Sequence, residues 1–169
     1  NLESGKSVVM GGHLTSASGK NELGITGGKT NLCVVTGSTT NSRLNLNSFD
    51  LTCTFDHNAN KSWHVFDVTN GAKLTVTGGI TGDGRMVLTF QDVKSQVYLF
   101  SVSNGGTLVL EAGVQIEINY PAGEREYVYS FNINGIKESF AKYDGIYVDD
   151  SVDGKITITV GVTTTITET

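Results

Sequence analysis

The chain has little proline, cysteine and charge, and each scarcity excludes a class of protein. A single proline, Pro121, among 169 residues rules out a proline-rich linker or a collagen-like chain. The two cysteines, Cys33 and Cys53, are too few for a structural zinc site or a dense disulfide framework. We expect both to be free, buried thiols. No apolar run approaches the roughly 18 residues of a transmembrane helix, so membrane insertion by such a helix is excluded.

Charged residues make up only 17% of the chain, and the net charge is −5 without any cluster of lysine or arginine. Proteins bind nucleic acids largely by neutralising phosphates with basic side chains. Anionic membrane surfaces select basic segments for the same reason. The composition therefore excludes nucleic acid as a partner and disfavours anionic membranes, and no cofactor is predicted.

Small polar and β-branched residues take the place of charge. The chain holds 21 Gly, 21 Thr, 14 Ser and 13 Asn, and 28 Val and Ile against 6 Ala. β-branched residues favour strands, whereas a helical protein needs more of the good helix formers. The composition predicts an all-β protein.

A sequence repeat runs along the chain. Residues 66–71 (FDVTNG) match residues 100–105 (FSVSNG), and an alternating apolar strand follows each, at Leu74 and at Leu108. Looser copies extend the pattern toward the N-terminus. We expect equivalent strands to start near residues 8, 44, 74 and 108, and preceding strands near 23–25, 65–68 and 97–102.

A recurring strand–corner–strand unit favours a solenoid in which equivalent residues stack about 4.8 Å apart. Asn70 would lie over Asn104 as a structural ladder at the corners, because Asn and Gly tolerate the left-handed backbone of a corner. We predict a right-handed parallel β-helix of about four to five irregular coils with a C-terminal cap. A β-sandwich of antiparallel hairpins is the alternative, since Asn-Gly is also a hairpin signal.

Residues 4–15 (SGKSVVMGGHLT), 23–28 (LGITGG) and 68–82 (VTNGAKLTVTGGITG) support a comparison. Over about residues 4–119 the chain resembles the right-handed β-helix repeats of bacterial surface proteins, adhesins and phage fibres. The resemblance implies a fold and leaves the function open. We assign residues 1–119 to the coils and 120–169 to a capping or assembly segment, in which residues 136–143 are expected to form a short helix.

Exposed aromatic side chains often stack on sugar rings, so aromatics are the candidate ligand-binding residues. Trp63 is the only tryptophan, and His64 follows it. Tyr127 and Tyr129 are expected to share one face of a strand. These four residues form the predicted glycan-binding set.

Acidic residues offer a calcium site and a catalytic pair, and both are weaker predictions. Asp149, Asp150 and Asp153 form the densest acidic patch, and calcium binds several oxygens of a flexible loop. Glycoside hydrolysis needs two carboxylates about 5–9 Å apart. Asp83 and Asp92 are the nearest candidates, but we interpret them as a turn former and a solvated loop residue and assign no catalytic residue.

These patterns predict a non-enzymatic structural or adhesive module of an extracellular, cell-surface or virion protein. The expected partners are other copies of the chain or neighbouring coils of a longer protein, and surface glycans. A carbohydrate-binding or polysaccharide-cleaving β-helix is one alternative function. An oligomeric domain of a phage tail fibre or spike is the other.

Overall fold

The structure is a computed structural model, and it describes residues 9–10, 13–16, 22–26, 31–39, 41–45, 51–57, 63–78, 85–93, 95–133, 136–138 and 143–168. Within these ranges the regular elements are strands and one 3-10 turn, η1 (Arg125–Tyr127), so the chain is all-β as predicted. The same ranges contain no helix that is long and apolar enough to cross a membrane.

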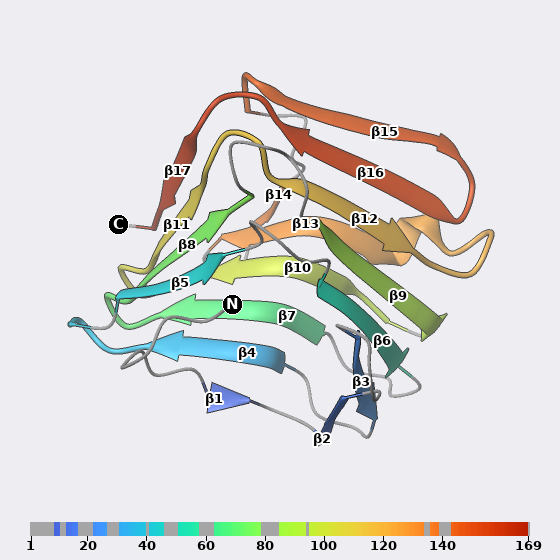
Figure 1. Cartoon of the computed structure of the whole chain (residues 1–169), viewed down its shortest axis with the longest axis horizontal. Coiled ribbons are helices and arrows are strands. Elements are labelled where there is room, and N and C mark those ends of the chain that lie inside the picture. Colours follow the sequence, from blue (N-terminus) through green and yellow to red (C-terminus); the bar gives the residue numbers. More distant parts are fainter. Residues whose placement is uncertain are drawn as a thin grey trace.

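The strands form three open sheets (Figure 1). The six-stranded sheet has the order β1 (Val9–Met10), β4 (Asn31–Thr36), β7 (Trp63–Thr69), β10 (Val97–Val102), β13 (Val128–Ile133) and β14 (Ile136–Glu138). The four-stranded sheet has the order β17 (Thr164–Thr167), β11 (Thr107–Leu110), β8 (Lys73–Thr77) and β5 (Asn41–Asn45). The seven-stranded sheet has the order β15 (Ile146–Val152), β16 (Lys155–Val160), β12 (Gln115–Asn119), β9 (Met86–Val93), β6 (Leu51–His57), β3 (Glu22–Thr26) and β2 (His13–Ser16).

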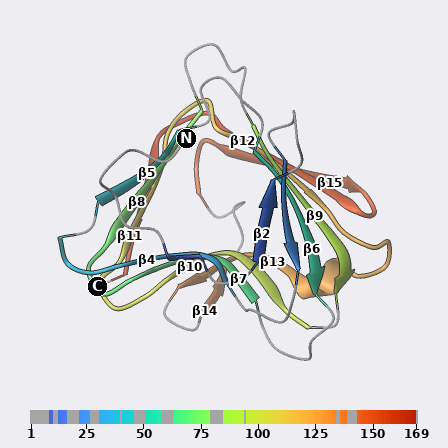
Figure 2. The same cartoon turned by 60° about the horizontal axis from the view of Figure 1, so that its bottom comes forward.

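Strands three apart in the chain pair in parallel in every sheet. The parallel series are β4–β7–β10–β13, β5–β8–β11 and β3–β6–β9–β12. The chain therefore visits the three sheets in turn and returns to each one beside its previous strand. Figure 2 shows the three series along three sides of the molecule. We call β4–β5–β6, β7–β8–β9 and β10–β11–β12 the three-strand units.

The 34-residue repeat corresponds to the spacing between the second and third units. Phe66 pairs with Phe100 in register, and their rings stack with centroids 5.3 Å apart. Leu74 pairs with Leu108 in the next sheet. The clearest part of the repeat is thus confirmed as one strand lying beside its copy.

Alternation along the strands builds the core. Leu74 and Val76 on β8 and Leu108 and Leu110 on β11 are at most 1% exposed. Successive side chains of a strand point to opposite faces, so such pairs line one face of the sheet. Full burial of each aliphatic side chain stabilises the fold by about 1.5–3 kcal/mol.

Several details of the predicted repeat are wrong. Each unit has three strands, because β6, β9 and β12 form a further series that the prediction merged with the corners. The strand expected near residue 8 is β1, which pairs antiparallel with β4 in a different sheet from β5, β8 and β11. The strand at residues 23–25 is β3, and it lies beside β6 and not beside β7. In β5, Leu44 pairs with Val76, two residues away from the predicted register.

The predicted helix at residues 136–143 is also wrong at its start. Residues 136–138 are β14, which pairs antiparallel with β13. Pairing with the edge of β13 satisfies backbone groups of both strands, and such tertiary pairing overrides a weak local helix preference. Residues 139–142 lie outside the described ranges.

The corner before β11 brings two units into close backbone contact. A Cβ atom built on Gly106 would lie 2.4 Å from the carbonyl oxygen of Val68, in the previous unit. Real Cβ atoms do not approach an oxygen so closely, so only glycine fits at this position.

We predict that Gly106→Ala lowers the free energy of unfolding by about 3 kcal/mol, because the backbone of one unit must move away from the other. Gly123→Ala is the matched control. Nothing lies within 4 Å of its Cβ position, so only its positive φ of 87° opposes the change. The control should lose about 1–2 kcal/mol. Urea denaturation measures both, and equal losses would contradict the close contact.

Candidate functional site

The Asn-Gly corners between the six-stranded and four-stranded sheets have left-handed backbone. Asn70 and Asn104 have φ of 55° and 49°, and Gly71 and Gly105 follow with φ of 77° and 75°. Asparagine and glycine adopt this region at the lowest cost, which explains why this dipeptide recurs. The two corners occupy equivalent places after β7 and β10.

Hydrogen bonds connect successive corners. The side-chain amide of Asn70 donates to Thr36 Oγ1 at 2.9 Å, and that of Asn104 donates to Thr69 Oγ1 at 3.4 Å. The backbone N–H of Gly71 donates to the carbonyl of Asn104 at 3.0 Å. Each amide thus reaches a threonine of the preceding unit, so the predicted ladder residues hold neighbouring units together through hydroxyl partners.

Among the predicted glycan-binding residues, the structure describes the side-chain packing of His64 and Tyr127. His64 is half-buried and packs edge-on against Tyr98, with ring centroids 5.5 Å apart. Tyr98 is only 3% exposed, which leaves no free face for a sugar ring. Trp63 and Tyr129 lie on β7 and β13, on either side of β10.

Tyr127 is not on the same strand as Tyr129, contrary to the prediction. It ends the η1 turn, is half-buried and packs against the core. The turn ends where β13 begins, so of the two tyrosines only Tyr129 lies on the strand.

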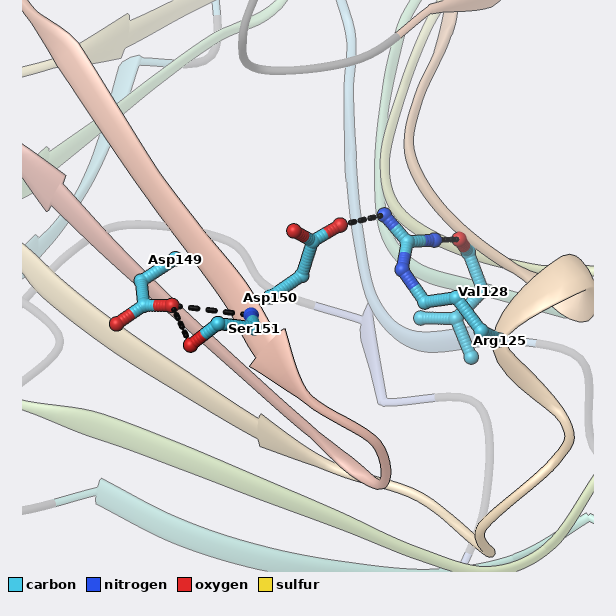
Figure 3. Close-up of polar contacts among 5 residues, drawn as sticks. All are labelled: Arg125, Val128, Asp149, Asp150 and Ser151. Atoms are coloured by element: carbon cyan, nitrogen blue, oxygen red, sulfur yellow. Dashed lines mark hydrogen bonds and ion pairs between the residues drawn. The ribbon is translucent and has the colours of Figure 1, made fainter.

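The three acidic residues of the predicted calcium patch each have a partner within the chain, and Figure 3 shows those of Asp149 and Asp150. Asp149 Oδ1 accepts the N–H and the hydroxyl of Ser151 at 3.0 and 2.7 Å, and these bonds lower the pKa of Asp149. Asp150 lies 3.3 Å from Arg125 Nη2. Asp153 accepts the backbone N–H of Gly123 at 2.9 Å.

Asp149 and Asp150 are exposed on β15, which is one of the two edge strands of the seven-stranded sheet. The pairing register of β15 shifts between Asp149 and Val152, as in a β-bulge. Charges and bulges on an outer strand hinder pairing with another chain. The patch thus has the features of a protected sheet edge.

Two ion-pair groups on the outer faces were not predicted. Glu117 on β12 lies 3.1 Å from Lys155 Nζ and 3.7 Å from Arg85 Nη1, and accepts a bond from the Asn119 amide at 3.1 Å. Burial alone raises the pKa of Glu117, but its hydrogen bonds and cations outweigh that effect and lower it. In the sequence, the only signal that Glu117 points outward is the alternation of apolar and polar residues along β12.

The second group crosses the four-stranded sheet. Arg43 on β5 lies 3.3 Å from Glu111, which follows β11, so the pair reaches across β8 between them. Thr75 and Thr77 on β8 are buried although they are polar. Both ion-pair groups connect residues that lie on or beside different strands of one sheet.

The two candidate carboxylates of the sequence analysis are Asp83 and Asp92. Asp83 lies outside the described residues. Asp92 is not a loop residue as predicted: it lies on β9, half-buried, and pairs in register with Asp56 of β6. Cys33 and Cys53 lie on β4 and β6, in different sheets.

Within the part of the chain that the structure describes, no group of three or more His, Cys, Asp or Glu could hold a metal ion. Comparisons with protein-family models, curated proteins and solved structures found no match for this chain. The geometry of the chain itself is therefore the basis for inferring its function.

We predict that Asn104→Ala lowers the free energy of unfolding by about 1–2 kcal/mol, because alanine is strained in left-handed backbone. Asn104→Gly is the matched control, since it removes the same amide but keeps the backbone conformation accessible. The control should lose only a few tenths of a kcal/mol, about the usual cost of glycine at a capping position. Thermal denaturation compares the two, and an equal loss would show that the amide contact dominates.

We also predict that His64 makes the fold less stable in mild acid. Burial lowers the pKa of His64, and the nearby charge of Asp67 opposes this only in part. The unfolded state therefore binds the proton more tightly, and stability is lost as the pH falls below about 6.5. Because solvent screens a half-buried group, the wild type should lose only about 0.5 kcal/mol more than His64→Gln between about pH 7 and about pH 5. Urea denaturation at both pH values measures the free energy of unfolding of the two proteins. An equal loss in the wild type and in His64→Gln would refute the prediction.

Proposed function

We propose that the chain is a structural module, built as a right-handed parallel β-helix, of an extracellular surface protein or virion fibre. The parallel pairing of strands three apart in all three sheets supports this proposal most strongly. In a β-sandwich of hairpins, consecutive strands pair antiparallel. Here each parallel connection passes through the other two sheets, which is how the coils of a solenoid succeed one another. The right-handedness rests on the irregular coils and on the resemblance to β-helix repeats.

The use of the surface polar groups supports a structural role. Arg43 of the first unit pairs with Glu111 of the third unit across β8, and Asn70 bonds to Thr36 of the unit before it. Glu117 pairs with Lys155 of the antiparallel strand β16. Each such pair is worth little alone, about 0–1 kcal/mol when exposed. Because such side-chain pairs recur between units, together they favour one fixed register of stacking.

A stack of this kind lengthens by about 4.8 Å with each added coil. Such a module serves as a rigid segment within a larger surface assembly. Its partners would be neighbouring coils of a longer protein or other copies of the chain. Surface glycans remain a proposed ligand class, for which His64, Trp63 and Tyr129 are the residues to test.

A direct test duplicates one unit. We expect that inserting a second copy of residues 63–96 after residue 96 gives a folded protein that is longer by about 4.8 Å along one axis. Small-angle X-ray scattering measures the dimension, and circular dichroism measures the strand content per residue. Insertion of the same 34 residues in shuffled order is the control, and it should unfold or aggregate.

Two results would overturn the proposal. If the true duplicate is as disrupted as the shuffled insertion, the units are not interchangeable coils. If the wild type releases reducing ends from a polysaccharide and Asp92→Asn does not, the chain is a glycan-cleaving enzyme and not a structural module.

A further inference from the structure

Two strands of the last three-strand unit, β11 and β12, pair with the C-terminal strands, whereas β10 pairs with β13. β16 pairs antiparallel with β12, and β17 pairs antiparallel with β11. Ile158 lies beside Ile116, and Ile166 lies beside Leu108. Figure 1 shows β16 and β17 following the outer side of this unit in the reverse direction. We call residues 153–168 the strap.

The strap also bonds to the backbone between and beyond these strands. Four N–H groups between and beyond β11 and β12 donate to strap oxygens. The bonds are Ala112 N–H to Thr163 Oγ1 (3.1 Å), Gly113 N–H to Val160 O (2.7 Å), Tyr120 N–H to Gly154 O (2.9 Å) and Gly123 N–H to Asp153 Oδ2 (2.9 Å). The strap therefore follows residues 105–123 along their whole length.

Glu168 takes the place that the next corner would occupy. At the earlier corner, the N–H of Gly71 donates to the carbonyl of Asn104 in the following unit at 3.0 Å. At the equivalent last corner, the N–H of Gly105 donates to Glu168 Oε2 at 2.8 Å. Glu168 is buried, and its own N–H donates to Gly106 O at 3.1 Å. A side-chain carboxylate thus replaces the peptide carbonyl of a further unit.

We propose that the strap terminates the stack by filling the place of a further coil, and that its release exposes an edge on which a second copy of this chain docks. An uncovered strand edge offers a row of unpaired N–H and C=O groups, which is a template for another chain. The strap shows that this edge accepts an antiparallel strand. Two identical edges related by a twofold axis also run antiparallel, so a second copy presents the matching partner.

This inference deepens the proposed function and rests on its coil stack. The two fail in different ways. If the stack is wrong, duplicating residues 63–96 disrupts the wild-type fold. If only the strap proposal is wrong, the duplicated protein folds and lengthens, but loosening the strap leaves the association state unchanged.

The test compares two substitutions on neighbouring residues of β17 in the full chain. Ile166 is 4% exposed against Leu108, whereas Thr165 is exposed. We expect Ile166→Asp to release β17 and to raise the average mass with protein concentration, toward about twice that of the wild type. Thr165→Asp adds the same charge outside the core, and it should keep the wild-type mass. Light scattering over a concentration series measures both.

A synthetic peptide of residues 153–168 distinguishes edge pairing from other aggregation. In excess it should return Ile166→Asp to the wild-type mass, while a scrambled peptide should not. A folded Ile166→Asp that keeps the wild-type mass at every concentration overturns the proposal. Association that the peptide does not reverse overturns it too, because another surface is then responsible.

If Ile166→Asp does not fold, a milder variant tests the proposal instead. Thr163→Val with Glu168→Ala removes the acceptors of the Ala112 and Gly105 N–H groups and leaves the strap core intact. Hydrogen exchange at these two amides should accelerate by about tenfold or more as the strap opens locally. Unchanged exchange would show that neither contact holds the strap, and the proposal would then be wrong.

Discussion

The parallel backbone pairing between strands three apart in the chain is the constraint on which the structure depends. It places Phe66 beside Phe100 and Leu74 beside Leu108, so a buried residue of one unit rests on its counterpart in the next. The same pairing brings Gly106 against Val68 and aligns the Asn-Gly corners. The outer edges of β11 and β12 also need partners, and β17 and β16 of the strap pair with them.

The sequence predicted the elements whose signals are local and repeated. The shared FxVxNG pattern at residues 66–71 and 100–105 identified the corner and the pairing offset together, because left-handed backbone selects Asn and Gly. β9 was missed, although its residues alternate between buried and half-buried as those of a strand should. β14 is short and depends on pairing with β13, which no local pattern reveals.

The candidate site was less predictable, because its chemistry depends on long-range neighbours. Asn70 and Asn104 were identified correctly as corner residues, yet their threonine partners follow only from the stacking register. The contact of Glu168 with Gly105 joins residues 63 positions apart, and no spacing in the sequence indicates it. His64 was predicted as a ligand-binding residue, and its packing against the buried ring of Tyr98 likewise follows only from the pairing register of β7 and β10.

Backbone nuclear Overhauser contacts in the isotopically labelled chain test the central pairing most directly. Parallel pairing of β8 with β11 predicts contacts of Leu74 with Leu108 and of Val76 with Leu110, so that both pairs have the same separation in sequence. Antiparallel pairing would instead join Leu74 to Leu110 and Val76 to Leu108. Observation of the first set supports the stacked units, and observation of the second set would contradict them.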